Sequence, residues 1–264
     1  MKFVTWNINS LRLRLPLLRQ LTEETAPDVI CLQETKVPDD LFPSEEIKLL
    51  GYEHYHFRGM KSYNGVAILS RYPLVPVTDT PQWCGQNDCR HVAAMLQAPS
   101  GPITIHNFYV PAGGDIPDAE TNPKFAHKLR FIEEARDWFR KNTPQRSILV
   151  GDLNTAPLEH DVWSHKQLLK VVCHTPAETT RHNEWEKQGF VDAMRVLYPE
   201  PQKLYTWWSY RNHDWKKSNR GRRLDHIWIT PDLRPDLKEI TILARARDWQ
   251  PPSDHVPVLA ELTL

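Results

Sequence analysis

The sequence predicts an α/β fold for a single domain that covers the whole chain, residues 1–264. Strand-length apolar runs rich in β-branched and aromatic residues recur along the chain, and each ends at Pro, Gly, Asn or Ser. Segments with apolar residues at helical spacing lie between some of these runs. No linker or low-complexity segment divides the chain, and its length is sufficient for one large core.

The predicted strands are short and evenly spread. They span Phe3–Ile8, Val29–Gln33, Gly65–Ser70, His91–Leu96, Ile103–Val110, Ser147–Asp152, Leu224–Ile229 and Val256–Leu262. A first helix is predicted from Leu15, where Leu18 and Leu21 continue one apolar face and Pro27 ends the pattern. A second helix is predicted over Pro123–Lys141, where an apolar stripe runs among charged residues.

Composition narrows the class of protein. The 33 Lys and Arg balance the 33 Asp and Glu, which excludes a strongly basic nucleic-acid coat protein and an acidic tail. The 4 cysteines lack the spacing of a disulfide framework or a structural zinc site, which favours a reducing compartment. Polar residues from Thr5 onward exclude a signal peptide, and no apolar run reaches the roughly 18 residues of a membrane span. We therefore expect a soluble, cytoplasmic protein without a membrane segment.

Polar residues end several predicted strands, at the edge where α/β proteins tend to form sites. Asn7 and Glu34 follow the first two strands. Asp152 and Asn154 stand two residues apart after an apolar strand, so they share a face if the chain stays extended. Turn formation is the ordinary role of such residues. A carboxylate beside an amide is also the arrangement that holds and activates a water molecule.

A further acidic residue and a histidine complete the candidate set. Asp225 lies inside an apolar run, and a buried carboxylate needs a partner because leaving it unpaired is costly. His255 precedes the last strand, next to Asp254. A lone histidine is usually structural, but with Asp225 as orienting partner His255 becomes a proton donor. Hard oxygen ligands favour Mg²⁺ or Mn²⁺ over zinc, and phosphate-ester hydrolysis fits this set best.

Motifs in a fixed order extend over nearly the whole chain. They are WNINS, LQETK, NGVAILSR, NFYVPAG, GDLNTAP, YTWWSYR, RLDHIW and SDHVPV. Together they closely resemble the exodeoxyribonuclease III family of class II AP endonucleases, within the endonuclease/exonuclease/phosphatase superfamily. The resemblance implies a four-layer α/β sandwich, in which helices flank two central mixed β-sheets.

The resemblance also implies an activity. It indicates a DNA-repair nuclease that uses Mg²⁺, with Mn²⁺ as a substitute, to activate water against the phosphodiester 5′ to an abasic site. The products would be a 3′-hydroxyl and a 5′-deoxyribose phosphate, and 3′→5′ exonuclease and 3′-phosphatase activities are expected beside it. The substrate would be double-stranded DNA with abasic sites or blocked 3′ ends, and the protein would act as a monomer.

The family's metal shell maps onto this sequence residue by residue. It would comprise Asn7, Glu34, Asp152, Asn154, Asp254 and His255. Glu34 would be the main metal ligand, supported by Asn7, and Asn9 would lie next to this shell. Asp152 would also align and deprotonate the attacking water, which Asn154 would orient.

The remaining catalytic residues would act on the phosphate. Tyr109 would stabilise charge there, although a tyrosine at a strand end is more often a packed ring with a wet hydroxyl. His255, held by Asp225, would bind a phosphoryl oxygen and stabilise the transition state.

A basic stretch, residues 211–223, follows two adjacent tryptophans and holds 6 Lys and Arg against 1 Asp. Such a stretch is often a solvated face, but beside aromatic residues it also has the composition of a phosphate clamp with a stacking element. In the family, the corresponding loop enters the minor groove and helps to form a pocket for the extruded abasic sugar. The expected DNA contacts are Arg90, Trp207, Trp208, Lys216, Lys217, Arg220, Arg222 and Leu224, with Trp207 and Leu224 lining the pocket and a core position as the alternative for Trp208.

Two positions depart from the family pattern. Arg222 stands where relatives commonly carry a large apolar residue, and Ala112 stands where they often have Asn or Gln. Both departures leave the catalytic residues intact. They would affect the relative strength of the AP endonuclease, 3′→5′ exonuclease and 3′-phosphatase activities, because they lie beside the pocket.

Two other functions are compatible with parts of this pattern. A phosphoinositide or sphingomyelin phosphodiesterase of the same superfamily would share the catalytic residues, but it should lack the tryptophans followed by a basic loop. A non-catalytic nucleic-acid-binding regulator should have lost carboxylates, whereas Glu34, Asp152, Asp225 and Asp254 are all present.

Overall fold

A computed structural model describes residues 1–212 and 214–264 and contains two six-stranded mixed sheets. The first sheet has the order β11-β12-β1-β2-β4-β3. Its strands are β1 (Lys2–Asn7), β2 (Val29–Gln33), β3 (His54–Arg58), β4 (Val66–Ser70), β11 (Leu237–Ile242) and β12 (Val258–Leu262). β1 and β2 are parallel, whereas the other neighbours in this sheet are antiparallel.

The second sheet has the order β5-β6-β7-β8-β10-β9. Its strands are β5 (Leu74–Val77), β6 (His91–Ala98), β7 (Gly101–Tyr109), β8 (Ser147–Asp152), β9 (Val191–Asp192) and β10 (Asp225–Ile229). β7 and β8 form the parallel pair of this sheet. The parallel pairs β1–β2 and β7–β8 lie in the middle of their sheets, and β1 and β2 contact β8 across the interface between the sheets.

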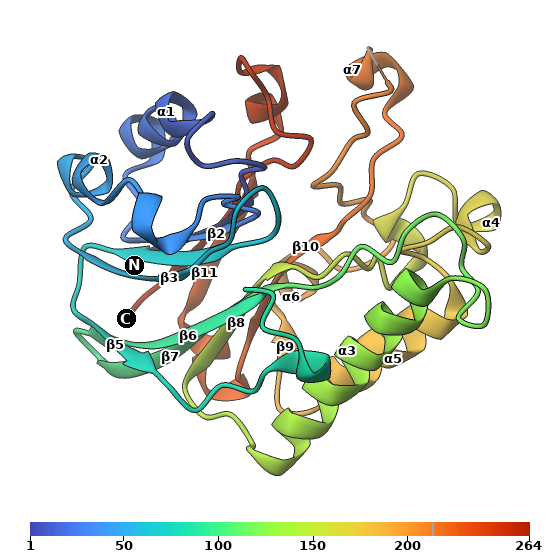
Figure 1. The fold of residues 1–264 in the computed structure, drawn as a ribbon, viewed down its shortest axis with the longest axis horizontal. Coiled ribbons are helices and arrows are strands. Elements are labelled where there is room, and N and C mark those ends of the chain that lie inside the picture. The colour runs from blue at the N-terminus through green and yellow to red at the C-terminus, as the bar shows by residue number, and fades with distance from the viewer. Residues whose placement is uncertain (213) are drawn as a thin grey trace.

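Helices cover both outer faces, so the molecule has four layers (Figure 1). α1 (Leu15–Thr25) and α2 (Ser44–Leu49) lie outside the first sheet, and α3 (Pro123–Lys141) and α5 (Pro176–Glu186) lie outside the second. The short helices are α4 (His165–Leu168), α6 (Ala193–Leu197) and α7 (Trp215–Ser218). This arrangement confirms the predicted four-layer sandwich.

Alternation along the strands builds separate hydrophobic clusters. In β1, Phe3 belongs to the cluster between the two sheets, whereas Val4 and Trp6 belong to the cluster under α1. In β8, Val150 faces the central cluster and Leu149 faces α3 and α5. Each such side chain, when fully buried, stabilises the fold by roughly 1.5–3 kcal/mol. Alternate side chains of a strand therefore pack against different layers, one on each face of the sheet.

Among the residues that the structure describes, no helix has the length and apolar character needed to cross a bilayer.

Buried histidines predict a specific pH dependence of stability. His91 and His106 share a hydrogen bond of 3.2 Å inside the aromatic cluster under α3. Burial lowers the pKa of His106 to about 4 and that of His91 well below its ordinary value, the latter helped by repulsion from His106. In the unfolded chain both would take up protons near pH 6.5, so the folded state loses stability as pH falls from about 6.5 toward about 4.

A His106→Phe variant isolates this effect. The free energy of unfolding of the wild type should fall between pH 7 and pH 4.5 by up to about 3 kcal/mol more than that of the variant, which cannot bind a proton at this position. Urea unfolding followed by tryptophan fluorescence at several pH values measures the difference. Parallel pH curves for the two proteins would contradict the assignment.

Candidate active site

A cleft of about 580 Å³ opens at one edge of the two sheets, where several strands begin or end. Glu34 follows β2, Asp152 ends β8 and Tyr109 ends β7, and all three line this cleft. His255, from the segment before β12, also lines it. The structure therefore brings together residues from across the sequence, as the motif analysis predicted.

Asn7 joins the two main carboxylates of the cleft. Parallel pairing of β1 and β2 sets Asn7 opposite Gln33, next to Glu34. The Asn7 Nδ2 group donates to Glu34 Oε1 at 2.9 Å and to Asp152 Oδ2 at 2.9 Å. Burial opposes ionisation of Glu34, but the hydrogen bonds from Asn7 and Lys36 outweigh it and lower its pKa. Asn7 thus fixes the spacing of two acidic groups on facing sheets.

The turn after β8 presents Asp152 and Asn154 together. The backbone N–H of Asn154 donates to Asp152 Oδ1 at 3.0 Å, and Asn154 Nδ2 donates to the Val110 carbonyl oxygen at 2.8 Å. Asn154 adopts a left-handed conformation, with φ of 49°, in which asparagine is better tolerated than most residues. Burial raises the pKa of Asp152, although His255 opposes the shift. Asp152 is therefore suited to accept a proton.

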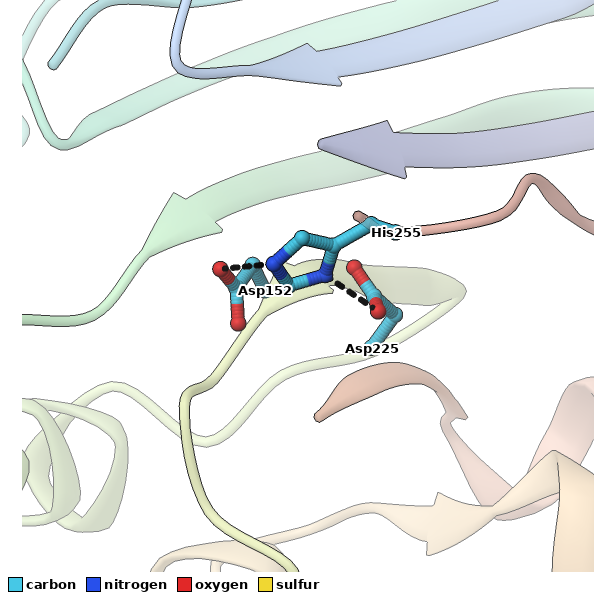
Figure 2. Close-up of side chains that lie close together, drawn as sticks. All are labelled: Asp152, Asp225 and His255. Atoms are coloured by element: carbon cyan, nitrogen blue, oxygen red, sulfur yellow. Dashed lines mark hydrogen bonds and ion pairs between the residues drawn. The ribbon is translucent and has the colours of Figure 1, made fainter. Parts of the chain in front are cut away.

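His255 lies between two aspartates, as Figure 2 shows. Its Nδ1 atom is 2.8 Å from Asp225 Oδ2, and its Nε2 atom is 3.6 Å from Asp152 Oδ2. Thr206 Oγ1 donates to the same Asp225 oxygen at 2.6 Å. Burial alone would lower the pKa of His255, but the charges of Asp225 and Asp152 raise it above its ordinary value. The predicted pairing of His255 with Asp225 is confirmed.

The residues present fit a divalent cation. One ligand atom each from Asp152, Asp225 and His255 lies within 4.8 Å of the others. Asp225 Oδ1 is buried and has no hydrogen-bond partner among the described residues. Glu34 adds a further carboxylate through its link to Asn7. From the sequence, Asp225 was expected only to orient His255. Its position among the possible ligands of a cation is a new feature of the site.

Two further predicted residues lie in the cleft but in different settings. The Tyr109 side chain is nearly buried, and burial raises its pKa well above the ordinary value. Asp254 accepts hydrogen bonds from Trp207 Nε1 at 2.9 Å and from Asn9 Nδ2 at 3.3 Å. Asp254 therefore joins the catalytic end of the cleft to its aromatic wall.

The second half of the cleft has a wall of aromatic and guanidinium groups. Trp207, Leu224, Arg220 and Arg222 all line it, as does Ala112. The guanidinium carbon of Arg222 lies 5.1 Å from the centre of the Trp207 ring. Arg220 lies in the same way over Trp163, at 4.9 Å. Stacking occupies only the face of a guanidinium group, so the N–H groups on its edge can meet phosphate oxygens, although Arg222 Nη1 already donates to Cys173 Sγ at 3.2 Å.

Other predicted DNA contacts lie elsewhere. Trp208 is only 3% exposed, packs against Trp215 and donates to Asn219, so the alternative of a core ring is correct and the predicted DNA contact is wrong. Arg90 is bound to Asp88 and lies over the Tyr109 ring, outside the residues that line the cleft. Its predicted contact with phosphate is not favoured, because its charge is already paired with Asp88 and it does not line the cleft.

The basic stretch divides into parts with different roles. Lys216 and Lys217 are exposed on α7, where Lys216 pairs with Asp248 at 2.6 Å. Arg223 is fully buried and pairs with Asp161 and Asp192, so it serves the core and not DNA. Position 213 of this stretch lies outside the described residues.

Several residues of the site were not found from the sequence. Thr206 binds Asp225, Trp163 supports Arg220, and Lys36 pairs with Glu34. Lys128 is fully buried and donates to the Asn154 carbonyl oxygen at 2.6 Å. Lys36 stands within the LQETK motif and Thr206 within the YTWWSYR motif, so both had a usable signal, whereas no motif marks Trp163 or Lys128.

The two-sheet sandwich and the acidic cleft with its Asp–His pair define the class of protein, a hydrolase of the endonuclease, exonuclease and phosphatase type. The model of the Endonuclease/Exonuclease/phosphatase family matches residues 4–255, and the chain belongs to this family.

Similar proteins agree with this assignment. Exodeoxyribonuclease III of Haemophilus influenzae is 32% identical over 270 residues, which cover 99% of both chains. The structure of an AP endonuclease from Archaeoglobus fulgidus superimposes over 100% of both chains with a TM-score of 0.92 and 31% identity. A 3′ phosphatase from Neisseria, NExo, solved with a product DNA hairpin, gives a TM-score of 0.89 and 30% identity over 100% of both chains.

Proposed function

We propose that this protein is a DNA-repair nuclease that hydrolyses the phosphodiester 5′ to abasic sites in double-stranded DNA. The products would be a 3′-hydroxyl and a 5′-deoxyribose phosphate. The same site would remove nucleotides and phosphate groups from 3′ ends, including blocked ends. One observation carries the proposal. The same cleft contains the Asp–His centre and a wall formed by Trp207, Arg220 and Arg222. Exodeoxyribonuclease III and AP endonuclease relatives support it.

The protein's own groups would divide the chemistry among them. Asp152, with its raised pKa, would take the proton of the attacking water, and Asn154 would orient that water. His255, kept cationic by Asp225, would face the phosphoryl oxygens. Tyr109 would donate its hydroxyl proton in a hydrogen bond to the same phosphate.

The cofactor would be Mg²⁺, with Mn²⁺ as a substitute. Glu34 and Asp152 would hold it, assisted by Asn7 and Asn154 and with Asp225 close enough to contribute, whereas His255, in its cationic form, would face the phosphate instead of binding the ion. When bound, the cation would neutralise charge that develops on the phosphate and polarise the reacting oxygens. Oxygen-rich ligand sets of this kind suit these hard cations. Asp254, whose oxygens accept hydrogen bonds from Trp207 and Asn9, would complete this set at the aromatic end of the cleft.

The cleft wall favours DNA over a lipid phosphoester. Phosphates and an extruded sugar would find the stacked guanidinium groups of Arg220 and Arg222 beside the indole of Trp207. Retention of every catalytic carboxylate disfavours a non-catalytic regulator. We further propose that the protein works as a monomer in the cytoplasm, where a reducing environment suits its free cysteines.

One experiment tests this function. A duplex with a single tetrahydrofuran analogue of an abasic site should be incised 5′ to the analogue in the presence of Mg²⁺ and left intact in EDTA. An intact duplex and a duplex with a recessed 3′ end serve as comparisons. Absence of Mg²⁺-dependent incision would refute the AP endonuclease assignment. Efficient shortening of the recessed strand without incision would instead identify a 3′ exonuclease.

A further inference from the structure

Lys36 places an ammonium group against a carboxylate of the proposed metal set. Its Nζ atom lies 2.9 Å from Glu34 Oε2 and donates to Asn9 Oδ1 at 2.7 Å. The side chains of Lys36 and Glu34 are 28% and 19% exposed, so solvent screens the pair only in part. Since Asn7 occupies the other oxygen of Glu34, both oxygens of this carboxylate meet donors from the protein.

The turn after β2 fixes this contact. Glu34 and Lys36 both adopt left-handed conformations, with φ values of 49° and 52°. The N–H groups of Thr35 and Lys36 donate to the carbonyl oxygens of Gly65 and Asn64 at 3.1 and 2.9 Å. A Cβ atom at Gly65 would lie 2.1 Å from Thr35 Oγ1, so the turn packs against a position that requires glycine. Backbone strain of this kind persists where the surroundings enforce it, so the pair of Lys36 with Glu34 is built into the site.

The charge of Lys36 is directed at Glu34. Asn9, its other partner, is neutral. Within residues 1–212 and 214–264, Glu34 supplies the one carboxylate at ion-pair distance from Lys36. A divalent cation bound to Glu34 Oε2 would therefore stand within a few ångströms of a positive charge, at a separation where repulsion is strong in a partly desolvated cleft.

We propose that Lys36 is a positioning residue that holds Glu34 in place in the DNA-free protein, and that a divalent cation must displace its ammonium group to bind. Lys36 thus lowers the cation affinity of the free protein. This inference rests on the proposed metal dependence of the enzyme, and it concerns the affinity for the cation instead of the identity of its ligands.

Binding of Mn²⁺ to the DNA-free protein, measured by isothermal titration calorimetry, tests the inference. Lys36→Met removes the charge, and Lys36→Gln removes the charge but keeps a donor for Asn9. Both variants should bind Mn²⁺ at least about fivefold more tightly than the wild type, because the repulsion is gone. Lys36→Arg keeps the charge and should bind Mn²⁺ with at most about half the affinity of either uncharged variant.

Lys48→Met provides the matched control. Lys48 pairs with Glu45 on the exposed helix α2, so this variant loses the same charge away from the cleft and should bind Mn²⁺ as the wild type does. Unchanged or weaker Mn²⁺ binding by a folded Lys36→Met or Lys36→Gln variant would overturn the inference and leave the proposed function intact. No Mn²⁺ binding by any of these proteins would overturn both the inference and the proposed metal dependence.

Discussion

Replacement of Asp152 by Asn should slow DNA cleavage by about a thousandfold or more while changing DNA affinity by less than about threefold. Asp152 is almost fully buried and receives hydrogen bonds from Asn7 and from the backbone of Asn154. Asn has the same shape, so the surrounding contacts can persist. An amide cannot take a proton from water, and it binds a cation less well than a carboxylate does, so the chemical step alone should suffer.

Single-turnover cleavage of the abasic duplex, with binding followed separately by fluorescence anisotropy in EDTA, separates the two effects. Asp137→Asn is a matched control, because Asp137 lies on α3 and pairs with Arg136, away from the cleft. This control should cleave at the wild-type rate. Cleavage by Asp152→Asn at the wild-type rate would remove Asp152 from the chemistry, and loss of binding in parallel with cleavage would assign it to substrate recognition.

The sequence predicted the interior of each sheet but not its edges. All eight predicted strands are present, whereas β3, β5, β9 and β11 were missed, and these are the four edge strands of the two sheets. An edge strand has one neighbour and is less deeply buried, so its sequence lacks a continuous apolar run. β3 is half-buried along its whole length, and β5 contains Pro76, which an edge strand tolerates.

The site shows a similar division. The motifs predicted Glu34 and Asp152 and the pairing of His255 with Asp225, because these residues lie at or next to the ends of strands that the apolar pattern reveals. Thr206 was missed although it stands in the YTWWSYR motif, since its contact with Asp225 joins a loop to the start of β10 and nothing in the sequence relates the two positions.

The alternation of side chains in extended chain could have predicted which of these residues line the cleft and which are buried in the core. Arg222 and Leu224 both line the cleft, whereas Arg223 between them is buried in the core. Trp207 and Trp208 divide in the same way. Extended chain sends neighbouring side chains to opposite sides, so placing Leu224 in the pocket implied Arg222 there and Arg223 behind it. Sequence composition counted Arg223 among the six basic residues of this stretch, but Arg223 is buried and belongs to the core.

Replacement of Asp225 by Asn is the second change with a large expected effect. Asp225 Oδ2 accepts hydrogen bonds from His255 Nδ1 and from Thr206, inside the core, so its charge acts on His255 with little screening. Asn keeps the volume but removes the charge that holds His255 in its cationic form. We expect cleavage to slow by about a hundredfold or more, because the protein loses a charged group that faces the phosphate.

Thr206→Val tests whether the slower cleavage expected of Asp225→Asn comes from the lost charge or from a change in the orientation of His255. This variant removes the hydroxyl that donates to the same Asp225 oxygen and that accepts from the N–H groups of Leu224 and Asp225, and it leaves the pairing with His255 in place. It should slow single-turnover cleavage by less than about tenfold, because Asp225 keeps both its charge and its contact with His255. If the two variants slow cleavage equally, Asp225 acts by positioning His255 through a packed network. If only Asp225→Asn has a large effect, its negative charge is the property that catalysis uses, because the hydrogen-bonded frame is weakened in both proteins and the charge is lost in one.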